Sequence, residues 1–364
     1  MIKIRFTMMF FKKIVFFSIV LLIFSCSDDD DCCVQPDPDP LEVRGVDASF
    51  LPEVRTSGAA ILNAAGQAED MLTTLQKAGV NTIRIRLWNN PASPTSGFAQ
   101  VKALAAEVKS KGMKVWLCMH YSDTWADPGH QTKPAAWTGI GFEALQDSVY
   151  QFTKKAAAEI LPDYIQIGNE INGGLLWPEG GLSNISQMKT LLAEGIRAVR
   201  DHSLTTQIMI HYAGHQEAMW FFNQIGAMDY DIIALSYYPF WHGKNFFQLE
   251  NNMTQLGNTF NKKVLIAETA YPFTLDWNDQ TNNVIGLANQ IHPDYPASAE
   301  GQKNFLLKLR GAVESSSRGI GFCYWGAEWV AFKGNTATDG SSWENMALWD
   351  FNLRALPAMD AFKE

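Results

Sequence analysis

Cysteine is scarce in this sequence of 364 residues, and its five cysteines are not spaced like a disulfide framework. Cys32 and Cys33 are adjacent in a polar stretch, whereas Cys118 and Cys323 lie in separate apolar runs. Secreted scaffolds that depend on disulfides are short and dense in cysteine. The sequence therefore excludes that class, and we predict that Cys118 and Cys323 are free thiols in the core.

Clustered positive charge and the common metal or nucleotide motifs are also missing. The formal net charge is -9 and no basic cluster follows the extreme N-terminus, so we expect no nucleic acid partner. The chain has no HExxH or CxxC pattern, no GxSxG turn and no Walker loop. His211 and His215 lie four positions apart without a convincing helix, which disfavours a zinc site. We predict that catalysis needs no cofactor.

No apolar run is long enough to cross a membrane comfortably. The longest, residues 14–24 (IVFFSIVLLIF), follows Lys12 and Lys13 and fits the apolar part of a signal peptide, which we place at residues 1–25. The run ends in IFSC, which resembles the lipobox of bacterial lipoproteins. This resemblance implies cleavage before Cys26 and acylation of that cysteine.

Residues 26–40 are acidic and rich in proline, so we predict an extended tether. Its SDDDD segment at 27–31 resembles the export signal of lipoproteins that reach the outer face of the outer membrane. We therefore expect a cell-surface protein anchored in the outer membrane through lipid on Cys26. A soluble secreted or periplasmic protein is the alternative.

From residue 41 onward, short β-branched apolar runs alternate with segments of helical periodicity. Eight runs are predicted strands, at 42–46, 82–87, 114–119, 164–167, 207–211, 232–236, 263–267 and 320–324. Predicted helices between them include 68–79, 99–112, 144–160, 188–202 and 302–316, together with a short segment at 216–227 that could be irregular.

Strands that alternate with helices pair in parallel, and eight such units indicate an α/β fold, a closed (β/α)8 TIM barrel formed by residues 41–364 as a single domain. The alternative is an open doubly wound sheet, which needs a glycine-rich turn after its first strand. Residues 44–52 (RGVDASFLP) have no such pattern. A barrel predicts that the chemistry lies at the carboxyl ends of its strands.

Two glutamates follow predicted strands directly: Glu170 ends IQIGNE and Glu268 ends KVLIAE. Either one alone fits an ion pair, but two carboxyl groups at one barrel mouth are what cleavage of a glycosidic bond requires. Asn169 is suited to bind the 2-hydroxyl of a sugar, so we assign Glu170 as acid/base and Glu268 as nucleophile.

A neighbouring side chain is needed to keep Glu268 ionised. Arg86 ends the run TIRIRLW and points to the same face of its strand as Arg84, so we expect its guanidinium to do this. The hydroxyl group of Tyr238, or else of Tyr237, is the alternative. The proximity of the two glutamates should raise the pKa of one of them.

Tryptophans favour a sugar substrate, because indole rings pack on the C–H faces of pyranoses. Many lie in predicted mouth loops, and we expect about half of these to be structural. They are Trp88, Trp125, Trp137, Trp177, Trp241, Trp277, Trp325, Trp329 and Trp343.

Several motifs together resemble family 53 of the glycoside hydrolases, the endo-β-1,4-galactanases: RLWNNP (86–91), HYSDTWADPG (120–129), QIGNE (166–170), LSYYPFW (235–241), IAETAYP (266–272) and GSSWENMALWDF (340–351). The resemblance implies a (β/α)8 barrel that cleaves β-1,4-galactan or galactooligosaccharides with retention, with Glu170 as proton donor and Glu268 as nucleophile. We expect a monomer whose substrate-binding residues are Asn169, Arg86, His120, Asp123, Tyr238, Trp241 and Trp325.

The sequence departs from the family pattern at the mouth. Cys118 and Met119 replace the usual residues before HYSD, and Gly326 and Ala327 replace the Glu-Pro of YWEP, which puts the number of subsites in doubt. Similarity to bacterial members also implies a calcium site in the loop after the seventh strand. Its expected ligands are Asp276, Asn278, Asn282 and Glu344, with Gln280 and Ser341 as further candidates.

Two other functions remain open on this evidence. One is a related glycosidase that acts on another β-1,4-glycan, such as mannan or glucan. The other is a barrel that only binds glycan at the cell surface, although both glutamates and Asn169 are retained.

Overall fold

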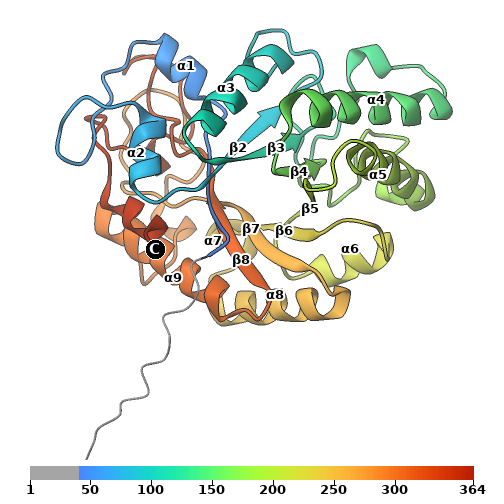
Figure 1. Ribbon diagram of the computed structural model, residues 1–364. Coiled ribbons are helices and arrows are strands. Elements are labelled where there is room, and N and C mark those ends of the chain that lie inside the picture. The colour runs from blue at the N-terminus through green and yellow to red at the C-terminus, as the bar shows by residue number, and fades with distance from the viewer. Residues whose placement is uncertain (1–40) are drawn as a thin grey trace, which may run out of the picture. The chain divides into compact units, whose positions relative to one another are not determined.

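Eight parallel strands form a closed barrel in the computed structural model, which describes residues 41–364 (Figure 1). Each strand pairs with its neighbours in chain order, and β8 closes the ring against β1. The TIM barrel predicted from the sequence is therefore confirmed. The predicted signal peptide at 1–25, Cys26 and the tether at 26–40 lie outside the described residues. The strands are β1 (Val43–Asp47), β2 (Thr82–Leu87), β3 (Lys114–Met119), β4 (Tyr164–Ile167), β5 (Gln207–Ala213), β6 (Ile232–Ser236), β7 (Lys263–Thr269) and β8 (Gly319–Tyr324).

The strands are apolar and β-branched because nearly every residue in them is buried on one face or the other. Side chains that face outward from the barrel pack against the helices and belong to the larger of two buried clusters. The second, smaller cluster is separate from it and fills the interior of the barrel below the site. Its members are Val43, Trp116, Tyr164, Met209, Ile232, Ala234, Leu265, Ala267 and Cys323.

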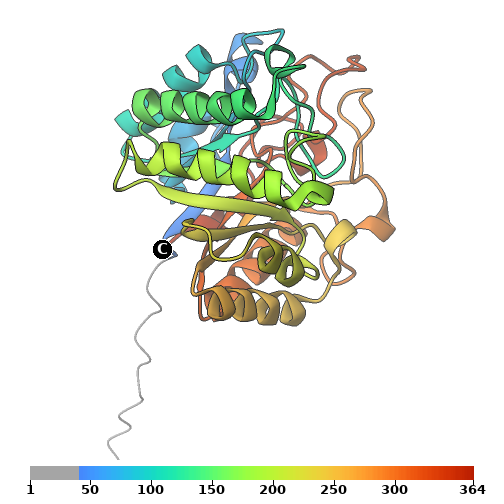
Figure 2. The ribbon, with the colours of Figure 1, turned by 90° about the vertical axis from the view of Figure 1, so that its right-hand side faces the viewer.

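Helices surround the barrel, as two perpendicular views show (Figures 1 and 2). None of the helices among residues 41–364 is both long and apolar enough to traverse a lipid bilayer. The helices are α1 (Leu51–Thr56), α2 (Met71–Lys77), α3 (Phe98–Ser110), α4 (Phe142–Ile160), α5 (Ile185–Arg200), α6 (Ala218–Ile225), α7 (Pro239–His242), α8 (Phe246–Phe260) and α9 (Ala299–Ser315).

Helix α8 was not among the predicted helices, because its asparagines, threonines and paired phenylalanines have low helix propensity. Tertiary packing compensates, since Leu249, Met253 and Leu256 recur at helical spacing and are buried. Asn245 caps its first turn by accepting a hydrogen bond from the backbone of Gln248. The uncertain segment at 216–227 contains the regular helix α6.

Strands β6 and β7 are irregular where they approach the mouth of the barrel. The register shifts between Leu235 and Ser236, so that Ser236 lies opposite Glu268. An irregularity of this kind changes the direction of the side chains that follow it. Here it brings the end of β6 and the end of β7 to the same cavity.

Candidate active site

A cavity of about 690 Å³ opens at the carboxyl ends of the strands. It is lined by both predicted catalytic glutamates and by six of the seven predicted substrate-binding residues: Arg86, His120, Asn169, Tyr238, Trp241 and Trp325. Asp123 does not line it. The Asp123 carboxylate instead accepts hydrogen bonds from the backbone of Asn90 and Ala135, so it holds two mouth loops together.

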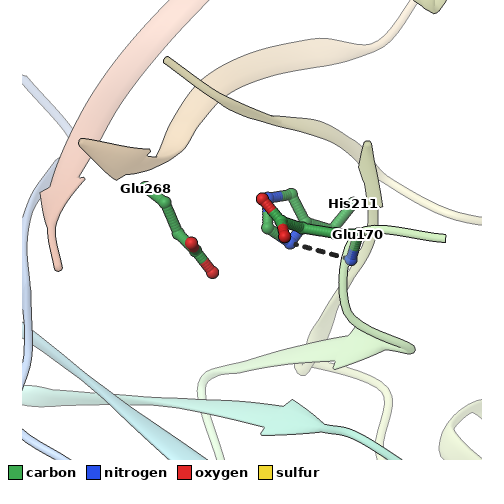
Figure 3. Close-up of side chains that lie close together, drawn as sticks. All are labelled: Glu170, His211 and Glu268. Atoms are coloured by element: carbon green, nitrogen blue, oxygen red, sulfur yellow. Dashed lines mark hydrogen bonds between the residues drawn. The ribbon is translucent and has the colours of Figure 1, made fainter. Parts of the chain in front are cut away.

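Glu170 and Glu268 approach each other from opposite sides of the ring, from the ends of β4 and β7 (Figure 3). A carboxylate oxygen of each, together with a ring nitrogen of His211, lies within 4.8 Å of the others. The two carboxyl groups are thus close enough to act on one sugar.

The turn after β4 presents Asn169 and Glu170 in a strained backbone. Gly168 has φ +80° and a Cβ at this position would lie 2.6 Å from Ile171, so only glycine fits. Glu170 itself has φ +47°, which is uncommon for a residue with a side chain. Strain of this kind persists where the surrounding structure fixes the chain for a function.

Arg84, and not Arg86, forms the ion pair with Glu268, which corrects the expectation from the sequence. Its Nη2 lies 2.7 Å from Glu268 Oε1, and its Nη1 lies 2.9 Å from Asp47 Oδ2. Both arginines point into the barrel, as the alternation of β2 predicts, but they occupy different layers. Arg84 pairs in register with Asp47, whereas Arg86 lies two residues closer to the mouth.

Arg86 is held among aromatic rings instead. Its guanidinium lies 4.0 Å from the ring centre of Trp125 and 4.7 Å from those of Trp88 and Phe50. Its Nε donates to Ser96, and its buried Nη2 has no hydrogen-bond partner within residues 41–364. Arg86 lines the cavity beside these rings.

Tyr238 and Tyr237 were the alternatives for holding Glu268, and the geometry supports only Tyr238. The Tyr238 hydroxyl donates to Glu268 Oε2 at 3.2 Å. The Tyr237 side chain is fully buried beside His215 and Phe246, and its hydroxyl has no hydrogen-bond partner within residues 41–364.

Asn169 is fixed on both sides of its amide. Its Oδ1 accepts from Arg84 at 2.8 Å, and its Nδ2 donates to the Ala126 carbonyl at 2.8 Å. The second hydrogen on Nδ2 is available to a sugar hydroxyl. Arg84 therefore orients both Asn169 and Glu268.

The two carboxyl groups differ in their electrostatic environment. Burial, together with the nearby charge of Glu268, raises the pKa of Glu170 to about 8. Burial also raises the pKa of Glu268, but the Arg84 guanidinium opposes this shift. Because only Glu268 has a cation in contact, a single proton shared by the pair resides on Glu170 at neutral pH.

Aromatic side chains form two walls of the cavity. Trp125, Trp325 and Trp329 line one side with Phe50 stacked on Trp329 at 4.1 Å. Trp241, which is 48% exposed, lies on the side of β6. With Trp343, five of the nine predicted loop tryptophans line the cavity; Trp88 and Trp137 are buried, and Trp177 and Trp277 lie elsewhere.

Four buried polar residues at the site were given no role from the sequence: Asp47, Arg84, His211 and Ser236. Asp47 and His211 lie at predicted strand ends, which face the mouth. Arg84 was recognised as facing the same side as Arg86, but the ion pair was assigned to Arg86. Nothing in the local sequence of Ser236 distinguishes it from an ordinary residue at the end of a strand.

The expected calcium ligands do not fit a preformed cation site. Both carboxylate oxygens of Glu344 accept hydrogen bonds from the backbone of Asn278 and Asp279. Asp276 and Asn282 are exposed, and Asp276 accepts instead from the hydroxyl of Thr274. The buried Asp279 carboxylate further accepts from the backbone of Thr281 and Ser341, so the two loops are joined by carboxylate to amide hydrogen bonds.

Comparison with known proteins gives consistent matches over almost the whole described chain. A family model described as "Glycosyl hydrolase family 53" matches residues 43–362. The sequence is 37% identical to an arabinogalactan endo-beta-1,4-galactanase of Cellvibrio japonicus, over 88% of this chain and 90% of that protein. Among solved structures, the Ignisphaera aggregans GH53 catalytic domain superposes with a TM-score of 0.85 at 37% identity, covering 90% of this chain and 97% of that one. A fungal beta-1,4-galactanase superposes with a TM-score of 0.79 at 30% identity, covering 88% and 99%.

Proposed function

The chain belongs to glycosyl hydrolase family 53, and on this premise we propose that it hydrolyses the β-1,4-galactosidic bonds of galactan, including type I arabinogalactan, with retention of configuration. Relatives named as galactanases support the substrate class. The observation that carries the mechanism is the approach of Glu170 and Glu268 to within 4.8 Å.

In the first step, the Glu170 carboxyl gives its proton to the glycosidic oxygen while a Glu268 oxygen attacks the anomeric carbon. The bond from that carbon to the leaving oxygen breaks, and a glycosyl ester on Glu268 forms. Arg84 and Tyr238 hold the Glu268 carboxylate ionised and oriented for this attack. Asn169 is placed to bind the 2-hydroxyl as charge develops on the ring.

In the second step, the Glu170 carboxylate removes a proton from a water molecule. The water oxygen attacks the anomeric carbon from the side that the leaving group vacated, and the ester bond to Glu268 breaks. Glu170 is then protonated again and Glu268 is ionised, so the enzyme returns to its starting state.

The test is hydrolysis of galactan, mannan and glucan by the wild type and by Glu268→Ala, with product anomers followed by NMR. We expect galactan to be cleaved, β-anomers to appear first, and the variant to lose at least about 1,000-fold in kcat. Cleavage of mannan alone would replace the substrate assignment. Initial α-anomers would refute retention. An inactive wild type would favour the alternative of a barrel that binds glycan without cleaving it.

We further propose that the enzyme acts at the cell surface on a lipid anchor at Cys26, as the lipobox-like IFSC and the acidic SDDDD segment support. Loss of membrane attachment in Cys26→Ala would support this location, and an unchanged membrane fraction would refute it.

A further inference from the structure

Two buried side chains behind Glu170 are not used by the mechanism above. Ser236, at the end of β6, donates a hydrogen bond from Oγ to Glu170 Oε1. His211, on β5, places its Nε2 2.9 Å from Ser236 Oγ. Both are fully buried and neither lines the cavity, so neither can touch a substrate.

The surroundings of His211 assign the direction of this hydrogen-bonded chain. Its pKa is held well below the ordinary value by burial, so the ring is neutral. Nδ1 faces the Glu170 backbone N–H at 3.4 Å (Figure 3), and the nitrogen of the Gln166 side-chain amide lies 3.0 Å from it. Asn169 Oδ1 also lies 3.1 Å from Nδ1, but this oxygen already accepts from Arg84 at 2.8 Å and from the Gln166 side-chain amide at 2.9 Å, which occupies both of its lone pairs.

Nδ1 is therefore an acceptor, and the single ring proton resides on Nε2. From there it is donated to Ser236 Oγ, which leaves the Ser236 hydroxyl only one role, donation to Glu170. Every donor in the chain thus points toward Glu170 Oε1.

We propose that Ser236 and His211 are positioning residues that reserve Oε1 of Glu170 as a hydrogen-bond acceptor, so that the acid proton is carried on Oε2. This inference rests on the proposed function of Glu170. The same hydroxyl donates to Oε1 before and after proton transfer, so no rearrangement is needed between the two steps. In both steps Oε2 is the oxygen that exchanges a proton with the leaving group or with water.

Removal of the Ser236 hydroxyl has a defined effect on the acid. A donor to a carboxylate favours the ionised form, so its loss raises the pKa of Glu170. The charged and titratable groups that face Glu170 are unchanged by this substitution; they are Arg84 on β2, Asp127 in the loop after β3, His211 on β5, Tyr238 after β6 and Glu268 on β7.

The experiment compares Ser236→Ala with Ser236→Thr, which keeps a hydroxyl, in the full chain. Two substrates are used: galactan, whose leaving group needs a proton, and a 2,4-dinitrophenyl β-galactobioside, whose leaving group does not. We expect Ser236→Ala to lower kcat/KM for galactan about 10- to 100-fold and to leave kcat/KM for the aryl substrate within about threefold. In Ser236→Ala, the basic limb of kcat/KM against pH on galactan should also move to higher pH. Ser236→Thr should match the wild type in both kcat/KM and the position of this limb.

Equal losses on both substrates, or an unmoved basic limb, would overturn the positioning role while leaving the proposed function intact. A wild type inactive on both substrates would overturn the proposed function and the inference together. Thermal unfolding of each variant shows whether it has folded, and Ser236→Thr provides the comparison if Ser236→Ala has not.

Discussion

Arg84 determines the electrostatics of the site at the scale of a single residue. One fully buried guanidinium contacts both Asp47 and Glu268, and it also donates to Asn169. A buried charge of this kind is tolerable only because it is paired, and each of the three guanidinium nitrogens donates to a partner. Arg84 therefore couples the charge of the nucleophile to the position of the residue beside the acid.

We predict that Arg84→Met moves the acid limb of kcat/KM to higher pH. That limb reports the ionisation of Glu268, and loss of the guanidinium raises the pKa of Glu268 because the opposing positive charge is gone. Activity at neutral pH should fall by about 100-fold or more. The unfolding free energy in urea should fall by about 3 to 5 kcal/mol, since two buried carboxyl groups lose their partner.

Arg86→Met is the matched control for this prediction. Arg86 is equally buried on the same strand but has no ion pair within residues 41–364. Its loss should weaken substrate binding and leave the acid limb in place. An acid limb that shifts with Arg86→Met and not with Arg84→Met would show that the ion pair does not control Glu268.

The residues at the site were predictable to different degrees for a physical reason. Glu170 and Glu268 each end an apolar run, so their place at the rim follows from the strand pattern alone. The choice between Arg84 and Arg86 depends on how far the strands are staggered around the barrel. Stagger is a property of the closed ring, and no single strand encodes it.

At the scale of elements, the loop that follows β7 is fixed to the segment after β8 by carboxylates. Glu344 is 1% exposed and binds the backbone of Asn278 and Asp279, while Asp279 binds the backbone of Thr281 and Ser341. These amides would otherwise lie in the interior without partners. The cavity residues Val284 and Trp343 lie on these two segments, so the carboxylates position one wall of the site.

We predict that Glu344→Gln lowers the melting temperature and that calcium has no effect on the wild type. The amide replaces one acceptor oxygen with a donor that faces a backbone N–H, a loss of about 1 to 3 kcal/mol. Asp276→Asn, which changes an exposed residue of the same loop, should unfold like the wild type. The melting temperatures are compared with added calcium and with a chelator.

A calcium site would give a different pattern. The melting temperature of the wild type would rise with calcium and fall with chelator, and both variants would lose that response. This result would show that Glu344 binds a cation in preference to the two backbone amides.

At the scale of the whole molecule, the alternation of strand and helix predicted the closed barrel because eight units fill one ring. The long loops at the mouth have no periodic pattern, so their packing was not predictable. Glu328 is an example, because it lies in the loop after β8 and is completely buried. Its Oε1 accepts from the Phe50 backbone at 2.6 Å, and its Oε2 lacks a hydrogen-bond partner in the described part of the chain.

Glu328 makes the stability of the fold depend on pH. Burial, with a further contribution from Asp47, raises its pKa to about 8, whereas the ordinary value is near 4.5. Between these two values the folded protein binds a proton that the unfolded chain has released. Its contribution to the free energy of unfolding is therefore fully present below about pH 4.5 and is lost as the pH rises to about 8.

We predict that Glu328→Gln unfolds at a higher temperature than the wild type at pH 8 and at nearly the same temperature at pH 4.5. Glutamine keeps the oxygen that accepts from Phe50 and cannot ionise, so it removes the penalty that rises with pH. A gain of about 1 to 3 kcal/mol corresponds to a rise of about 1.5 to 4.5 °C in a domain of this size. Glu143→Gln, an exposed glutamate at the start of α4, is the control and should show no such dependence on pH. A gain that is equal at both pH values would arise from packing, and would show that Glu328 carries the same charge in the folded and unfolded states.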